Sequence, residues 1–379
     1  MRVQVVDPSA FTPPYDHALC AALARAGADV ELITSRFAYG SVAAPDGYAL
    51  REHFYRHARG AAGGRLRSMT KLAEHVPDML RYRQVSRAAD VVHFQWLDVQ
   101  WLDRRLLPRR PLVLTAHDLL PREPRPGQVS AQRRLYDAVD ALVVHSGYGR
   151  AQLVQELGLD PRKVHVIHHG AFEHLARLSP RPLDADLERV TGPVVLFFGL
   201  LRPYKGIDVL LDAWRALPAG SELWIVGRPR MDIAALRAGA PPRVRFISRY
   251  VSDAELASFF RRAEIVVLPY TRTDRFDQSG VLATALAFAT PTVLSDVGGF
   301  GEVAATGAGV VVPPGDAAAL AATLGELLRD EDRRMRMAQA AAAAAAGPYS
   351  WDEAARRTLK LYEQVMGGAD PAAPQSAPS

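Results

Sequence analysis

The chain has 379 residues, 49% of them hydrophobic, which favours a globular protein of two domains. Its formal net charge of +5 permits a nucleic-acid partner, but no zinc-knuckle, RNP or helix-turn-helix pattern accompanies the charge, so we expect none. The single cysteine, Cys20, excludes an intrachain disulfide and suits a reducing compartment.

Strand-like apolar runs alternate with helical patterns along almost the whole chain, which predicts an α/β fold with parallel sheets covered by helices. The opening run, MRVQVVD, is typical of a strand rather than of a signal peptide. No apolar run is long enough for a transmembrane helix, so we expect a cytoplasmic protein. The predicted strands are 2–6, 30–34, 91–94, 112–116, 142–145 and 164–168 in the first half, and 194–198, 222–226, 244–247, 265–269, 292–295 and 309–312 in the second.

The two groups of strands predict two domains, since each group has the size of one doubly wound sheet. We expect a Rossmann-like N-terminal domain over residues 1–170 and a C-terminal domain over residues 192–349. The segment 171–191 is rich in Pro and Arg, has no strong period, and is the expected linker. A last helix is predicted over 350–367, and the tail 368–379 is expected to be disordered.

A basic segment, residues 51–87, interrupts the first domain. It is rich in Arg and contains three glycines, so we expect a long insertion made of a loop and a helix. One interpretation is peripheral contact with an anionic membrane, on the inner face of the plasma membrane, and an acidic or membrane-bound acceptor. The other is a solvated, arginine-rich face without such a role.

Ligands of open α/β sheets bind beyond the carboxyl ends of the strands, so the residues at those positions are the first candidates for a site. In the first half they hold Tyr15, Asp16, His93 and Trp96, which we take as candidates for the acceptor side. His117 and a further histidine also follow strands there. A hydrogen-bonded structural role is the alternative for each histidine. Without an HExxH motif or clustered carboxylates, we expect no metal site.

The most informative stretch is VVLFFGLLRPYKGID, residues 194–208. It predicts a buried strand, a loop with Arg202 and Lys205, and a new helix. Two cations beside a helix N-terminus form a site for an anion with several oxygens, such as a diphosphate. The segment Asp277-Gln278-Ser279-Gly280 opens another helix whose free N–H groups allow a phosphate to approach, although an ordinary N-cap is the alternative. We expect both loops to hold one diphosphate.

Three common nucleotide and hydrolase motifs are missing from the sequence. No GxGxxG follows the first strand, which argues against a dinucleotide oxidoreductase. No GxxxxGK[ST] is present, which argues against a P-loop kinase or ATPase. No G-x-S-x-G occurs, which weakens the α/β-hydrolase interpretation.

The order of motifs from Met1 to about Met366 resembles the retaining family 4 glycosyltransferases of the GT-B fold. The resemblance is carried by VLTAHD, VDALVVHS, KVHVIHHGAF, FFGLLRPYKGIDVLLDAW, LWIVG, VRFISRYVSDAELASFFRRAEIVVLPY, QSGVLATALAFATPTVLSDVGGFGEV and GAGVVVPPGD. It implies two Rossmann-like domains facing across a cleft, with the last helix crossing back onto the first domain. It also implies transfer of a sugar from a UDP- or GDP-sugar to a glycan, lipid-linked or small-molecule acceptor, without a metal or other cofactor.

The resemblance further implies roles for single residues. Arg202 and Lys205 would bind the diphosphate, and His117 would lie near the donor sugar and the reacting centre, so these three are the expected catalytic residues. The donor-binding residues that it implies are Gly199, Arg202, Lys205, Arg249, Tyr250, Asp277, Gln278, Ser279, Gly280 and Thr284.

The sequence departs from the family pattern in two places. The Arg usually follows the Gly directly, where this chain has Leu200. The two glutamates that usually precede and contact the donor fall at Phe276 and Thr284, in a QSG form of the motif, and Asp274 or Asp277 is the candidate substitute for the first of them.

Other functions stay open at this point. A sugar-nucleotide 2-epimerase and a glycogen-type phosphorylase share the GT-B fold. A non-catalytic sugar-nucleotide-binding or scaffolding protein fits the missing glutamates. A nucleic-acid-binding module rests on the charge alone.

Overall fold

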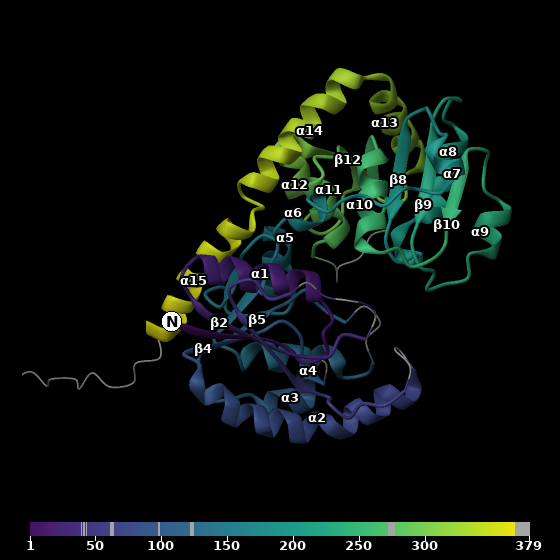
Figure 1. Cartoon of the computed structure of the whole chain (residues 1–379). Coiled ribbons are helices and arrows are strands. Elements are labelled where there is room, and N and C mark those ends of the chain that lie inside the picture. Colours follow the sequence, from purple (N-terminus) through teal and green to yellow (C-terminus); the bar gives the residue numbers. More distant parts are fainter. Residues whose placement is uncertain are drawn as a thin grey trace, which may run out of the picture. The chain divides into compact units, whose positions relative to one another are not determined.

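The computed structural model describes residues 1–38, 40, 42, 44–60, 64–97, 99–121, 125–271 and 277–367. It forms two compact units, one made of Met1–His168 and the residues from Trp351 onward, the other of His169–Ser350. Each unit contains one parallel sheet with helices on both faces (Figure 1). The α/β architecture with two parallel sheets that the sequence predicts is thereby confirmed.

The first unit is built on a seven-stranded sheet of order β3-β2-β1-β4-β5-β6-β7. Its strands are β1 (Arg2–Asp7), β2 (Asp29–Ser35), β3 (Ala49–Phe54), β4 (Val91–Phe94), β5 (Leu112–Thr115), β6 (Ala141–Val144) and β7 (Val164–Val166). All neighbours pair in parallel. The order changes direction between β1 and β4, and in doubly wound sheets ligands bind at the carboxyl ends of strands beside such a switch point.

Helices cover both faces of this sheet. They are α1 (Pro13–Arg25), α2 (Arg65–Val85), η1 (Ser86–Ala88), α3 (Gln100–Leu106), α4 (Gln128–Asp137), α5 (Gly147–Ala151), η2 (Gln152–Glu156) and α15 (Trp351–Gly367). The last helix, α15, lies beside α1 (Figure 1), where Arg25 and Asp352 form an ion pair of 2.7 Å. The C-terminal end of the described chain therefore completes the first unit.

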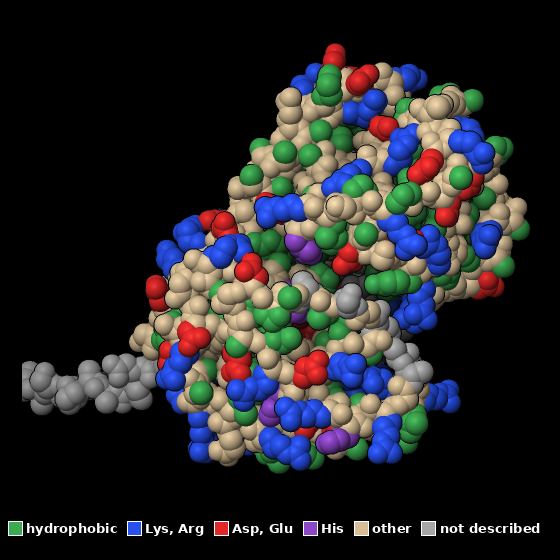
Figure 2. Space-filling view, viewed as in Figure 1, with side chains coloured by type: hydrophobic (Ala, Val, Ile, Leu, Met, Phe, Trp, Pro, Cys, Tyr) green, Lys and Arg blue, Asp and Glu red, His purple; other side chains and the backbone are tan. Residues whose placement is uncertain are grey.

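The basic segment begins with a strand rather than with the loop predicted from the sequence. Residues 51–54 are the second part of strand β3 rather than a loop, and β3 pairs with β2 at the edge of the sheet. Four of its six side chains are exposed, so it carries no apolar period from which a strand could be recognised. The expected helix is present as α2, and Figure 2 shows Lys and Arg side chains over the unit that contains it as well as over the other unit.

The second unit is built on a six-stranded sheet of order β10-β9-β8-β11-β12-β13. Its strands are β8 (Val194–Phe198), β9 (Glu222–Val226), β10 (Val244–Ile247), β11 (Ile265–Leu268), β12 (Thr292–Ser295) and β13 (Gly309–Val312). Its helices are α6 (Glu173–Ala176), α7 (Ala185–Glu188), η3 (Pro203–Lys205), α8 (Ile207–Arg215), α9 (Ala234–Ala238), α10 (Asp253–Arg262), α11 (Gly280–Ala287), α12 (Phe300–Val303), η4 (Ala304–Ala308), α13 (Ala317–Arg329) and α14 (Glu331–Ala346).

The segment expected as a linker, 171–191, packs within the second unit. It contains α6 and α7, and it buries Ala171, Leu175 and Leu187 against the unit. Because these few apolar residues are far apart in the sequence, they give no periodic pattern, yet they suffice to fix two short helices. The expected disordered tail, 368–379, lies outside the described residues.

One glycine decides how the second unit closes around its central strands. Gly206 has φ +64° and starts α8, and a Cβ at this position would lie 1.9 Å from the carbonyl oxygen of Pro269. Only glycine therefore lets α8 begin directly against the end of β11.

Within the described ranges, no helix has both the length and the apolar character needed to cross a bilayer.

Candidate active site

Lys205 is enclosed at the carboxyl end of β8 in the second unit. Its side chain is only 6% exposed, and its Nζ lies 5.1 Å from the ring centre of Tyr270 and 6.0 Å from that of Phe197. A Cβ on Gly199 would lie 2.8 Å from this Nζ and 3.3 Å from Cγ2 of Val281. Gly199, at φ +110°, thus leaves room for the ammonium group beside the first turn of α11.

Helix α11 presents its N-terminus to the same place. Ser279 is the N-cap, accepts a bond from the Val281 N–H at 3.3 Å, and lies 3.2 Å from the Tyr270 hydroxyl. The side-chain oxygen of Gln278 accepts a bond from the Ser279 N–H at 3.0 Å. The structure therefore brings Lys205, Ser279 and Gly280 together around Tyr270. An ammonium group beside the N-terminus of a helix is suited to bind a multivalent anion.

Arg202 lies on the adjoining loop and is half-buried. Leu201 pairs with the loop after β9, since its N–H donates to the Arg228 carbonyl oxygen and its own carbonyl accepts from the Arg230 N–H, at 3.0 and 2.9 Å. The backbone pairing brings three arginines onto neighbouring loops, and within the described part of the chain none of them has a carboxylate partner. Arg228 and Arg230 were not among the predicted site residues, although the Arg-Pro-Arg that follows Gly227 was a signal for them.

Arg249 and Tyr250 lie after β10, and their contacts are of another kind. Arg249 forms an ion pair of 2.8 Å with Glu255, which belongs to the capping box of α10 with Ser252. Tyr250 is 61% exposed, and its partial burial together with the charge of Asp253 raises the pKa of its phenol. Tyr250 offers an exposed aromatic ring, whereas the charge of Arg249 is already matched within its own helix start.

The positions that replace the family's glutamates are partly described. Thr284 is buried, and its hydroxyl donates to the Gly280 carbonyl oxygen at 2.8 Å, so its proton is used inside α11. Asp277 is completely buried, and its backbone carbonyl accepts the Gly299 N–H at 2.8 Å. Asp274 and Phe276 lie outside the described residues. Phe172, which the sequence did not single out, packs 3.5 Å from where a Cβ of Gly280 would lie.

In the first unit, His117 is held by a chain of hydrogen bonds. His145 Nδ1 lies 3.0 Å from the Ile167 carbonyl oxygen, which can only accept, so this nitrogen carries the proton. His145 Nε2 in turn lies 3.4 Å from Nδ1 of His117. On its other side, His117 Nε2 lies 3.1 Å from the side-chain oxygen Oε1 of Gln95, an acceptor. These contacts fix the orientation of the His117 ring.

An aromatic surface continues from His117. Trp96 stacks on the His117 ring at 5.0 Å with an interplanar angle of 14°, and its indole N–H donates to the Thr12 hydroxyl at 2.9 Å. Phe11, 55% exposed, packs edge-on against Trp96 at 5.4 Å. Tyr15 lies beneath, buried and 4.6 Å from the His117 ring, and burial raises the pKa of its phenol. Trp96 and His117 are therefore partly accessible, whereas Tyr15 supports them from below.

Asp16 forms a buried carboxyl pair with Asp7. Asp7 accepts N–H bonds from Ser9, Phe11 and Thr12 at 3.2, 2.6 and 3.2 Å. These bonds stabilise its ionised form, so the negative charge of the pair resides on Asp7. Burial raises the pKa of both groups, most strongly that of Asp16, which also has Asp7 as a charged neighbour. Asp16 therefore carries the shared proton and fixes the loop after β1.

His93, a predicted acceptor-side residue, lies in the core. Its two ring nitrogens lie 2.7 Å from the Tyr362 hydroxyl and 2.8 Å from the Thr115 hydroxyl, and burial lowers its pKa to about 3. It thus attaches α15 to the sheet as a neutral side chain, which is the structural alternative considered above. His117 and His145 adjoin each other, but among the described residues we found no cluster of three side chains suited to hold a metal ion.

Two family models match the two halves of the chain. Residues 192–330 match the model described as "Glycosyl transferases group 1", and residues 15–171 match "Glycosyltransferase Family 4". Among the similar proteins is a D-inositol 3-phosphate glycosyltransferase of Kineococcus radiotolerans, 30% identical over 93% of this chain and 91% of that protein. Another, from Xylanimonas cellulosilytica, is 34% identical over 63% of this chain and 60% of that protein.

The fold comparison agrees with the sequence comparison. HepE of Anabaena, solved in complex with UDP-glucose, superposes with a TM-score of 0.73 at 18% identity, over 96% of this chain and 100% of that one. The molecule is therefore a glycosyltransferase with the GT-B fold. Within that class, the chain belongs to glycosyltransferase family 4, which confirms the resemblance inferred from the motifs.

Proposed function

We propose that this glycosyltransferase transfers a sugar from a nucleotide-diphosphate sugar to a hydroxyl group of its acceptor, with retention of anomeric configuration. The observation that carries the proposal is the position of Lys205. Its ammonium group is buried beside Gly199 and the N-terminus of α11, where a diphosphate finds both a positive charge and the favourable end of a helix dipole.

The proposed reaction needs no nucleophile from the protein. The bond between the anomeric carbon and the diphosphate oxygen breaks, and the acceptor oxygen bonds to the anomeric carbon on the same face. The acceptor proton passes to an oxygen of the leaving diphosphate. Negative charge grows on that diphosphate as the bond breaks, so Lys205 and the α11 N-terminus stabilise the transition state more than the bound donor.

The remaining site residues are assigned to positioning. Arg202, with Arg228 and Arg230 on the neighbouring loop, would hold the outer oxygens of the diphosphate, since each guanidinium presents several N–H donors. Trp96 and His117 would contact sugar or acceptor hydroxyls in the first unit, because both are partly accessible and rigidly held.

Uracil is the base that we propose for the donor, with guanine as the alternative. HepE, which shares the fold, was solved with UDP-glucose, and this supports a UDP-sugar. The acceptor would be a glycan, a lipid-linked molecule or a small molecule. The relatives named above act, by their names, on D-inositol 3-phosphate, which favours a polyol.

A thermal-shift screen tests the proposal. A ligand that binds only the native state raises stability by RT ln(1 + [L]/Kd), so UDP and UDP-sugars should raise the unfolding temperature, and GDP should do so less. Lys205→Ala should reduce the shift, whereas Lys163→Ala, which removes an ammonium group that donates to the Asp137 and Val139 carbonyls, should not. If neither nucleotide shifts the wild type, the donor assignment is wrong. A retained sugar configuration in the product, read by NMR, tests the stereochemistry.

A further inference from the structure

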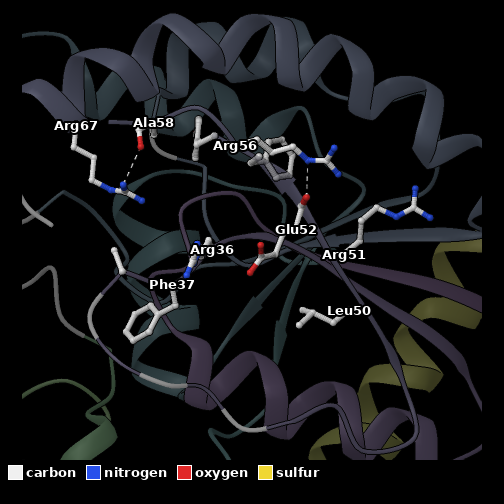
Figure 3. Close-up of a pocket in the computed structure, with 11 residues that line it drawn as sticks. Arg36, Phe37, Leu50, Arg51, Glu52, Arg56, Ala58 and Arg67 are labelled. Carbon is white, nitrogen blue, oxygen red and sulfur yellow. Dashed lines mark hydrogen bonds between the residues drawn. The ribbon is translucent and has the colours of Figure 1, made fainter. Parts of the chain in front are cut away.

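A second cationic site lies in the first unit, at the carboxyl ends of β2 and β3. It is a pocket of about 740 Å³, within the range of roughly 300–1,000 Å³ found for small-molecule sites. Figure 3 shows it lined from three directions, by Arg36 after β2, by Arg51 and Glu52 on β3, and by Arg67 on α2. None of the residues assigned above to the donor or to the His117 cluster lines it.

Most of the positive charge in this pocket is not matched by acidic side chains. Arg51 is neutralised by Glu31 at 2.7 Å. Arg56 donates from Nε to the Glu52 backbone carbonyl at 2.9 Å, and Arg67 donates from Nη1 to the Ala58 carbonyl at 3.2 Å. These carbonyl bonds orient the two guanidinium groups without cancelling their charge, and the other N–H groups of each can still bind a ligand.

Arg36 adds a third cation to the same pocket. It follows the last residue of β2, is exposed, and has no carboxylate within ion-pair distance in the described chain. The described lining of the pocket therefore carries more positive than negative charge, since Glu52 is its one acidic side chain against Arg36, Arg56 and Arg67. Several arginine forks around one space are suited to the tetrahedral oxygens of a phosphate group.

The floor of the pocket is rigid. Tyr55 has φ +52°, an unfavourable conformation for a bulky residue, and its N–H donates to the Asp78 carboxylate at 2.8 Å. Its hydroxyl lies 2.7 Å from His75 Nδ1, and His75 Nε2 lies 2.5 Å from the Asp103 carboxylate. Backbone strain of this kind persists where the surroundings over-determine it, and such sites are frequently ligand sites. The network fixes the residue directly before Arg56.

We propose that the pocket of Arg36, Arg56 and Arg67 binds the phosphate group of a phosphorylated polyol, the acceptor of this transferase. Glu52 selects the polyol. A carboxylate repels a bare anion but accepts hydrogen bonds from hydroxyl groups, and Figure 3 shows its side chain directed into the same space as Arg36. That the bound molecule is the acceptor rests on the proposed transferase function, whereas the presence of a phosphate site does not.

A phosphorylated polyol reaches the protein either as a soluble molecule or as a lipid headgroup. Exposed apolar side chains on α2, Leu66, Met69 and Leu72, are spaced by three residues and so share one side of the helix near Arg67. They suit a lipid surface, but the phosphate chemistry of the pocket is the same for both sources. The two sources are therefore separate arms of one experiment.

The experiment measures binding to the full-length protein. The soluble probes are myo-inositol 1-phosphate, inorganic phosphate and unphosphorylated myo-inositol, measured by calorimetry at constant ionic strength. The vesicle probes are phosphatidylcholine with and without phosphatidylinositol, measured by sedimentation. The test variant is Arg36→Gln/Arg56→Gln/Arg67→Gln. The matched control is Arg105→Gln, another exposed arginine that bonds to a backbone carbonyl, that of Trp101 at 2.8 Å.

We expect the phosphorylated polyol, or vesicles that contain phosphatidylinositol, to bind at least about tenfold more weakly to the triple variant, because charged hydrogen bonds are lost. Arg105→Gln should bind as the wild type does. Glu52→Gln should bind inorganic phosphate more tightly and should prefer the phosphorylated polyol less. Unchanged binding in the triple variant, equal binding of myo-inositol and its phosphate, or no binding of any probe would overturn the proposal.

UDP binding separates this proposal from the previous one. UDP should stabilise the triple variant as it stabilises the wild type, since none of the three arginines belongs to the second unit. Probe binding without any UDP effect contradicts the donor assignment alone. A UDP effect without probe binding contradicts the pocket alone.

Discussion

The two cationic regions of the molecule differ in what is buried. In the second unit the charge itself is enclosed, since Lys205 lies under Gly199 and against the ring of Tyr270. In the first unit the arginines lie at the surface, and the buried part is their support, the chain from Tyr55 through His75 to Asp103. Removing the charge of Lys205 in the second unit should therefore cost activity. Removing the hydrogen-bonded chain beneath the arginines of the first unit should cost stability.

The largest expected effect is a loss of stability when the hydrogen-bonded chain from Tyr55 through His75 to Asp103 is broken. His75→Ala removes the side-chain partner of the completely buried Asp103, which also accepts the Val99 N–H, and the acceptor of the Tyr55 hydroxyl. Breaking a buried pair of this kind costs about 3–5 kcal/mol of stability, measured by urea unfolding. Tyr55→Phe removes the neutral hydrogen bond to His75 and should cost about 0.5–1.5 kcal/mol. Similar small losses in both variants would show that the chain is not the support of the pocket.

The second effect concerns the enclosed charge. Lys205→Ala should lower kcat by about 10²–10³-fold while the fold survives, because the charge acts on the leaving diphosphate. Lys205→Arg should not restore the activity, because the larger guanidinium has no room beside Gly199. A Cβ at Gly199 would already lie only 2.8 Å from Nζ of Lys205. Lys163→Ala serves as the control for the loss of a lysine. Full activity of Lys205→Ala, with the correct donor and acceptor, would contradict the assignment.

The smallest expected effect is a change of stability with pH, and it concerns the buried carboxyl pair of Asp7 and Asp16. The pKa of Asp16 is raised by burial and by Asp7, so the folded chain binds more protons than the unfolded chain above the ordinary carboxyl pKa. Wild-type stability should therefore decrease as the pH rises from that ordinary pKa through the raised one. Asp16→Asn imitates the protonated form and should lose this dependence, so its advantage over the wild type grows with pH.

Asp7→Asn is the matched control for that pair. It removes the carboxylate that accepts three backbone N–H bonds, so it should destabilise the protein at neutral pH, unlike Asp16→Asn. Urea unfolding between acidic and mildly alkaline pH measures both variants. Equal destabilisation by the two substitutions would show that the proton does not belong to Asp16.

The sequence predicted the parallel sheets well, because buried strands such as Val194–Phe198 are continuous apolar runs. It missed β3, an edge strand whose polar side chains face solvent and leave no period. For the site, it identified Lys205 and Ser279, which the structure places around Tyr270. It did not reveal that His93 is a buried core residue, because the position of a side chain after a strand does not show what packs above it.

The sequence by itself therefore determined the α/β architecture and the family, since apolar periodicity and the order of motifs are properties of the linear chain. Only the tertiary structure decided which charges are enclosed and which are supported. Gly199 meets Lys205, and Tyr55 meets His75 and Asp103, through contacts between separate elements. Packing sets such contacts, and packing depends on the shapes of all neighbouring side chains at once rather than on any local pattern.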